Sequence, residues 1–340
     1  MKKSNRIIQL DYIRAIACLL VVLLHVCAYY VNFFDDVSRV DWIVANTIES
    51  LARACVPLFF MVSGFLFMLE KKPKIKNFSR LVASLLFYSA IALAMFLVAK
   101  KISPSSIMMT DFNFFTEPSF YHLWFLYPML GIYIFSYLIS VNKIDSKYAL
   151  LSVFVVFVVL NPRTSNLIEF TLGLNVNNLF MIDGVFIYYL LYAVSGAIIG
   201  NMAIKKELKL SKYTAILSII ISTVCISFLT LKTYEDGSYN EISFYDFNSP
   251  LVFILSLSIF YFIFSVKSFL VERAVVSVIA ENSLAIYGIH AFVLSIVKRF
   301  IDYKLHNAFL FIPLIFVLVV SISLIFSLAL KLIDKKRLFT

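Results

Sequence analysis

The chain has 340 residues, of which 61% are hydrophobic and only 15% are Asp, Glu, Lys or Arg, and its formal net charge is +10. Soluble domains carry about 25% charged residues, and a soluble fold of this length could not keep so much apolar surface out of water. A water-soluble enzyme is therefore excluded. The positive charge stands in short runs between apolar segments, so it indicates membrane topology and not nucleic-acid binding.

A membrane-spanning helix needs about 20 mostly apolar residues, and the chain offers ten segments of roughly this kind, of which the fifth is the shortest. Backbone groups in lipid must be satisfied within the segment, which predicts helices. We therefore predict an all-α polytopic membrane protein that forms a single transmembrane domain over residues 1–340. The predicted spans are 8–31, 43–69, 78–99, 120–140, 148–160, 180–201, 213–231, 250–266, 276–298 and 309–333.

Basic residues gather in alternate connections between these segments. One set of connections, together with both ends of the chain, holds 20 of the 30 Lys and Arg residues, whereas the opposite set holds eight. By the positive-inside rule both termini are predicted to be cytoplasmic. The first segment is longer than a signal-peptide core and no cleavage site follows it, so we expect it to remain as the first span. The expected location is the bacterial inner membrane.

The two remaining basic residues, Arg14 and Arg53, lie inside predicted spans. An arginine at a helix centre costs about 2.5–3.5 kcal/mol on insertion scales and usually marks a site or pathway. Arg14 and His25 are eleven residues apart, which returns to nearly the same helix face about 16 Å further along. Asp11 precedes Arg14 by three residues and can pair with it. The alternatives are that Arg14 snorkels to the headgroups and that His25 is a hydrogen-bonded core histidine.

Arg53 is predicted to reach the middle of the bilayer, too deep to snorkel to either surface. Pro57 leaves the carbonyl of Arg53 without its helical donor, so a kink is expected here that would open a polar pocket. The alternative is that Arg53 only holds helices together through backbone carbonyls.

Four further residues are candidates. His122 is expected at the outer interface, where an aromatic belt is an alternative explanation, and His290 is expected at the depth of His25. Asp183, near the outer end of the sixth span, can bind an acceptor hydroxyl or act as an interface residue, and Trp124 lies beside His122. The four cysteines lie in apolar segments without metal-ligand spacing, and we expect no metal site.

Four ordered motifs resemble those of the acyltransferase-3 family of integral membrane O-acyltransferases. Residues 10–17 followed by His25 are similar to its Arg-x10-His motif, and the further motifs lie at 53–64, 122–126 and 283–290. The resemblance spans nearly the whole chain. It implies that acetyl-CoA is supplied from the cytoplasm as acyl donor, with no permanently bound cofactor. It also implies a glycan hydroxyl or lipid-linked saccharide as acceptor, and an essential histidine at His25.

On this reading His25 acts as general base on the acceptor hydroxyl, because an imidazole has a pKa suited to that role. Arg53 would stabilise the developing oxyanion or anchor the donor, and Arg14, paired with Asp11, would bind a CoA phosphate. An acetyl-histidine intermediate is an open alternative. The residues expected to contact the acceptor are His122, Trp124, Asp183 and His290.

A function of another class is also compatible with intramembrane Arg and His residues. A transporter or flippase of a lipid-linked glycan would use them along an anionic pathway. Such proteins often have paired broken helices in their two halves, and Pro57 has no evident counterpart in the second half. Membrane lipids are the remaining expected partner.

Overall fold

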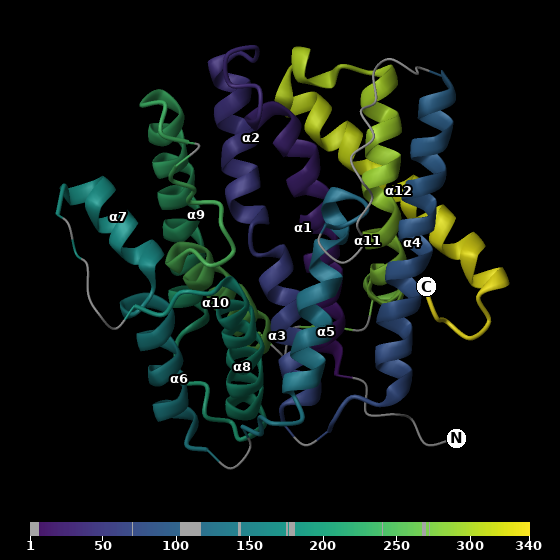
Figure 1. Ribbon diagram of the computed structural model, residues 1–340. Coiled ribbons are helices and arrows are strands. Elements are labelled where there is room, and N and C mark those ends of the chain that lie inside the picture. The colour runs from purple at the N-terminus through teal and green to yellow at the C-terminus, as the bar shows by residue number, and fades with distance from the viewer. Residues whose placement is uncertain are drawn as a thin grey trace.

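The computed structural model describes residues 7–69, 71–102, 117–141, 144–174, 176, 181–239, 241–266, 270–271 and 273–340. Within this part of the chain it is a bundle of helices without strands (Figure 1). The α-helices are α1 (Ile8–Val31), α2 (Arg39–Ala52), α3 (Cys55–Phe67), α4 (Ile75–Ile102), α5 (Leu126–Phe135), α6 (Ser146–Phe154), α7 (Pro162–Leu172), α8 (Val185–Ile204), α9 (Lys212–Glu235), α10 (Pro250–Ser265), α11 (Ala274–Phe300) and α12 (Ala308–Ile333).

Seven helical stretches of the described residues are long and apolar enough to cross a membrane. An eighth is obtained if α6 and α7, which are bent by 54° where they meet, count as one span. Helix α10 is apolar but shorter, with 16 residues. Each of the ten predicted segments contains a helix, which confirms the all-α polytopic membrane fold.

The second span is broken where the sequence predicts a kink. Helix α2 ends at Ala52 and α3 begins at Cys55, so Arg53 lies at the break. Pro57 falls in the first turn of α3, where helix N–H groups have no intrahelical acceptor and proline is tolerated. The two parts together still form one apolar stretch, Arg39–Phe67.

The fourth and fifth spans differ from the predicted ones. Instead of one helix over 120–140, the chain forms the 3-10 helix η2 (Tyr121–Phe125) and the ten-residue helix α5. The fifth span ends in a π-helical turn, η3 (Val155–Val159), after which Pro162 starts α7 in a new direction. The departure of the fifth span follows from its short apolar run, which does not reach the length of a full span.

The helices fall into three neighbouring groups. Figure 1 shows α6 to α10 on one side, α4, α11 and α12 on the other, and α1, α2, α3 and α5 between them. The central group joins the two sides because α3 packs on α8 and α1 packs on α11. One end of this bundle contains the start of α1, α4 and α11 and the residues after α12, and we call it the cytoplasmic end, as the basic residues predict.

Helices α3 and α8 approach closely through paired glycines. A Cβ atom on Gly64 would lie 1.7 Å from the Ala193 carbonyl oxygen, and one on Gly196 would lie 2.1 Å from that of Met61. Small residues that let backbones approach are the usual means of association in lipid, where the hydrophobic effect does not drive helices together. This contact fixes the side that carries α8 to the centre of the bundle.

We predict that Gly196→Ala destabilises the protein by about 1–3 kcal/mol, as overpacking typically does, because two backbones must separate. The loss of stability is measured by unfolding the purified protein in detergent, either with heat or by titration with SDS. Gly131→Ala is the matched control, since a Cβ there meets only the ring of Phe186, a movable side chain. Equal stabilities of the two variants would contradict the role given to the α3–α8 contact.

Candidate functional site

Three histidines from distant parts of the chain meet in the interior of the bundle. His25 comes from α1, His122 from η2 and His290 from α11, and we call them the histidine cluster. The ring centroids of His25 and His290 are 5.3 Å apart and stacked, and those of His122 and His290 are 5.2 Å apart. The predicted equal depth of His25 and His290 is therefore observed.

Backbone carbonyl groups fix the orientation of two of the imidazoles. His122 Nε2 lies 3.1 Å from the Gly288 carbonyl, and His290 Nδ1 lies 2.6 Å from the Tyr287 carbonyl. A carbonyl only accepts, so these nitrogens carry the protons. The opposite nitrogens, His122 Nδ1 and His290 Nε2, are buried without a hydrogen-bond partner among the described residues. Two basic lone pairs are thus available to a ligand in the cluster.

His25 is the accessible member of the cluster. It is partly exposed, whereas His122 and His290 are buried. Its ring meets the ring of Tyr121 edge to face at 5.0 Å, and Tyr121 is 48% exposed. A molecule arriving on the side of Tyr121 reaches His25 first.

His122 is buried inside the bundle, so its predicted place at the outer interface is wrong, and the alternative of an outer aromatic belt does not hold either. The chain enters the bundle before η2, and the short η2–α5 element places His122 beside α11 with 1% of its surface exposed. Its ring contacts Phe292 and Tyr287 as well as His290. The prediction failed because it assumed that residues 120–140 form one complete span.

Arg53 forms a buried ion pair with Glu49, one helical turn earlier on α2. Its guanidinium lies over the ring of Tyr245 at 4.0 Å and donates to the Tyr245 carbonyl at 3.5 Å. The Nε atom of Arg53 and Oε2 of Glu49 have no partner among the described residues. The charge of Arg53 is therefore compensated by Glu49 on α2 and covered by Tyr245 from the loop before α10.

A separate cavity of about 320 Å³ opens at the cytoplasmic end, between α1, α3, α4, α5 and α11. Arg14, Arg80 and Arg337 line it together with Asn77 and Glu281. Arg14 also pairs with Asp11 at 3.5 Å, as predicted. Arg80 and Arg337 stand in runs of basic residues at the cytoplasmic end, and nothing in the sequence predicts that they meet Arg14.

Arg337 reaches this cavity because the segment after α12 folds back on itself. The Asp334 carboxylate accepts hydrogen bonds from the backbone N–H groups of residues 338–340 and from the Thr340 hydroxyl. Burial alone would raise the pKa of Asp334, but these donors hold it below its usual value. The loop is therefore closed by a carboxylate that is ionised at neutral pH.

The folded-back segment is held against α4. Arg80 donates to the Thr340 carbonyl at 2.6 Å, Ser84 donates to that of Leu338, and Tyr88 donates to that of Phe339 at 3.0 Å. The Tyr88 ring also lies so close to Gly288 that a Cβ there would be 2.2 Å from it. Helix α4 thus contacts both the segment that carries Arg337 and the helix that carries His290.

Tyr287 separates the cavity from the histidine cluster. Its side chain lines the cavity, and its hydroxyl donates to the backbone carbonyl of His122. Its ring centroid is 5.8 Å from that of His290 and 5.5 Å from that of His122. A single side chain therefore stands between the basic cavity and the imidazoles.

The remaining predicted residues lie outside this arrangement. Trp124 stacks on Phe247 at 5.6 Å and contacts Tyr189, on the side of the loop that precedes α10. Asp183 is exposed, and its carboxylate accepts from the neighbouring Gly184 N–H. Among the described residues, no group of three or more His, Cys, Asp and Glu side chains is suited to a metal ion.

A comparison with protein families gives one match. The acyltransferase-3 family model, an acyltransferase domain, matches residues 7–328. That range contains every predicted site residue and nearly the whole chain. No curated protein and no solved structure gives a match.

We predict that Arg53→Met and Glu49→Gln each lower stability by about 3–5 kcal/mol, because each leaves a buried charge without its partner. The double variant should lose less stability than the two single variants lose together. SDS titration of all three proteins measures these losses of stability. Arg39→Met is the control: Arg39 pairs with Glu235 on the exposed surface, and such pairs are worth about 0–1 kcal/mol. Strict additivity of the two buried variants would show that the residues do not act as a pair.

Proposed function

Because this chain belongs to the acyltransferase-3 family, we propose that it is a bacterial inner-membrane O-acetyltransferase that uses acetyl-CoA. The acceptor would be a hydroxyl of a cell-surface polysaccharide or of its lipid-linked precursor. The family match supports membrane acyltransferase activity. The observation that carries the finer proposal is the basic cavity at the cytoplasmic end, one side chain away from the histidine cluster.

The cavity has the chemistry of a phosphate-binding site. Guanidinium groups bind phosphate oxygens through paired hydrogen bonds, and Arg14, Arg80 and Arg337 come from three separate elements. Its volume of about 320 Å³ is at the lower end of ligand sites. The phosphates of CoA would bind here, and the uncharged thioester arm would extend past Tyr287.

In the proposed reaction His25 accepts the proton of the acceptor hydroxyl while the hydroxyl oxygen attacks the thioester carbonyl carbon. Arg53 would stabilise the negative charge that develops on the carbonyl oxygen. The carbon–sulfur bond then breaks, and the CoA thiolate that leaves takes up the proton from His25. The products are the acetyl ester and free CoA. An acetyl-histidine route would use the same imidazole.

The acceptor would approach from the side of Tyr121, where His25 is partly exposed. His122, His290 and Trp124 would line or border its path, and Asp183 would contact it only if the glycan extends to the surface. From the segments 120–125 and 286–290 we infer a resemblance to the O-acetyltransferase of enterobacterial common antigen. That glycan is therefore the first acceptor to assay.

We predict that His25→Ala abolishes transfer of labelled acetyl from acetyl-CoA in proteoliposomes, a loss of at least about 100-fold as expected for a general base. Binding of CoA to the variant, read as a thermal shift, should remain. His306→Ala is the matched control, since His306 is exposed and outside the cluster. Full activity of a normally inserted His25→Ala protein would remove His25 from the mechanism.

We predict that Arg14→Ala, Arg80→Ala and Arg337→Ala each raise the KM for acetyl-CoA by about 10- to 100-fold, because each removes a charged hydrogen bond worth about 1.5–3 kcal/mol. The value of kcat should change much less. Arg299→Ala, at the opposite end of α11 and exposed, provides the comparison. An unchanged KM in all three variants would refute the assignment of the phosphates to this cavity.

A further inference from the structure

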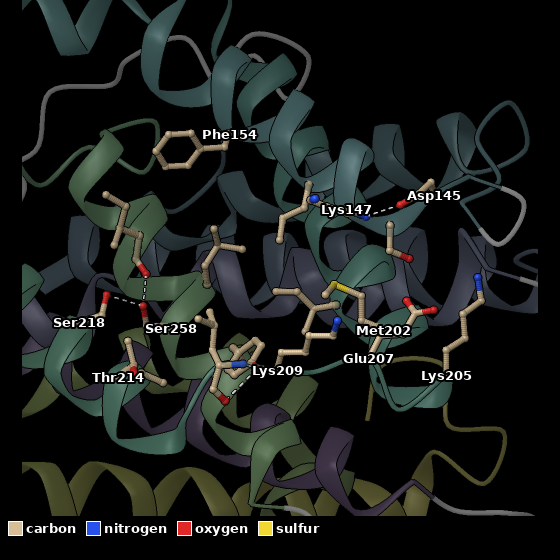
Figure 2. Close-up of a pocket in the computed structure, with 18 residues that line it drawn as sticks. Asp145, Lys147, Phe154, Met202, Lys205, Glu207, Lys209, Thr214, Ser218 and Ser258 are labelled. Atoms are coloured by element: carbon tan, nitrogen blue, oxygen red, sulfur yellow. Dashed lines mark hydrogen bonds between the residues drawn. The ribbon is translucent and has the colours of Figure 1, made fainter.

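A second cavity of the described residues has no part in the chemistry above. It measures about 700 Å³ and lies between α6, α8, α9 and α10 (Figure 2). None of its lining residues lines the basic cavity or belongs to the histidine cluster. In the arrangement of Figure 1 it lies in the group of helices opposite α11 and α12. It therefore requires an explanation of its own.

One part of this second cavity is charged. Lys147 comes from the start of α6, and Lys205 and Lys209 come from the connection between α8 and α9. All three are exposed, and no ion pair involves them among the described residues. Asp145 and Glu207 also line this part, but the Asp145 side chain caps α6 by accepting from the Lys147 N–H. The charge balance is positive.

The rest of the cavity is apolar. In Figure 2 the labelled lysines and acids lie on one side, and Phe154 and the Ser218–Ser258 pair lie on the other. The two serine hydroxyls bind each other at 2.8 Å, so they offer little to a polar ligand. Leu150 and Leu257 cover the interior, and Phe154 is 42% exposed on the outer face of the bundle. The cavity thus has a basic rim and an apolar interior.

The basic rim is held in place by a partly buried contact. The hydroxyl of Tyr261 on α10 accepts from the Leu210 N–H at 2.7 Å and donates to the Leu210 carbonyl at 3.1 Å. These two hydrogen bonds to the backbone of one residue fix the connection that carries Lys205 and Lys209. A site whose cations are positioned by a tyrosine from another helix is preformed, and a ligand loses little free energy in ordering it.

We propose that this cavity binds one anionic glycerophospholipid of the cytoplasmic leaflet. Its phosphate would lie among Lys147, Lys205 and Lys209, and part of its acyl chains would fill the apolar interior beside Phe154. Basic pockets between transmembrane helices on the cytoplasmic side have this specificity, because the leaflet there is rich in anionic lipid. A free phosphate would leave the apolar interior uncovered, and a neutral lipid would leave the lysines without a counter-ion.

Such a lipid would join α6 and α8 to α9 and α10. These helices already meet in pairs, α6 with α8 and α9 with α10, and the cavity lies where the two pairs adjoin. A bound lipid would add contacts that the folded protein has and the unfolded protein lacks. Anionic lipid is therefore expected to raise the thermal stability of this protein.

The test compares dioleoylphosphatidylglycerol with dioleoylphosphatidylcholine as probes on the full-length protein in detergent. Native mass spectrometry counts retained lipid, and thermal unfolding gives the stabilisation. The triple variant K147Q/K205Q/K209Q should bind phosphatidylglycerol at least about tenfold more weakly, since each juxtamembrane lysine contributes to anionic-lipid binding. The matched control K71Q/K74Q/K76Q removes the same charge at the same end of the bundle, outside the cavity, and should bind normally.

A second variant tests the apolar part. Ser218→Phe fills the interior and leaves the lysines, so it should remove retained phosphatidylglycerol without changing the thermal shift given by CoA, which reports correct folding. Equal binding of the two phospholipids, or equal loss in the two triple variants, would overturn the proposal. Preferential binding of undecaprenyl phosphate over phosphatidylglycerol would also overturn it, because the occupant would then be a polyprenyl carrier.

Discussion

The buried ion pair of Arg53 and Glu49 is the interaction on which the outer side of the site depends. An unpaired charge in hydrocarbon is too costly to keep, and the pair is possible because α2 places the two residues one turn apart at its end. The break before α3 leaves Arg53 at this helix end and allows Tyr245 to cover its guanidinium. Tyr245 also bonds to Asn46 on α2, so the loop before α10 is anchored at the same place.

The basic cavity and the histidine cluster would offer different surroundings to the anionic and the neutral parts of the proposed thioester donor. Three arginines gather at the cytoplasmic end, where phosphates can remain near water. Beyond Tyr287 lie aromatic rings and the imidazoles of His122 and His290, whose N–H groups donate hydrogen bonds to backbone carbonyls. Phosphate has a high cost in such a region, whereas an acetyl thioester does not. The phosphates of the proposed donor would therefore stay in the basic cavity, and its acetyl thioester would lie beyond Tyr287.

The sequence was sufficient for the features that depend on local periodicity. Each predicted apolar segment contains a helix, although α7 lies outside these segments, and Pro57 marked the break before α3. Glu49 was missed although it precedes Arg53 by four residues, a spacing that indicates an ion pair. That signal was present and was not used.

Other features arise from contacts between distant parts of the chain. Nothing in the neighbourhood of Arg80 or Arg337 distinguishes them from other basic residues at the cytoplasmic end, and only the return of the segment after α12 brings them to Arg14. The burial of His122 depends likewise on how η2 enters the bundle. The family match covers both regions but does not describe their geometry.

The position of Tyr88 has a mechanical consequence. Its hydroxyl donates a hydrogen bond to the Phe339 carbonyl, and its ring packs against Gly288. The Gly288 carbonyl in turn accepts a hydrogen bond from His122 Nε2. Through these contacts Tyr88 and Gly288 connect the end of the chain to the imidazole of His122. A side chain at position 288 would separate the two, because only a glycine leaves room there for the Tyr88 ring.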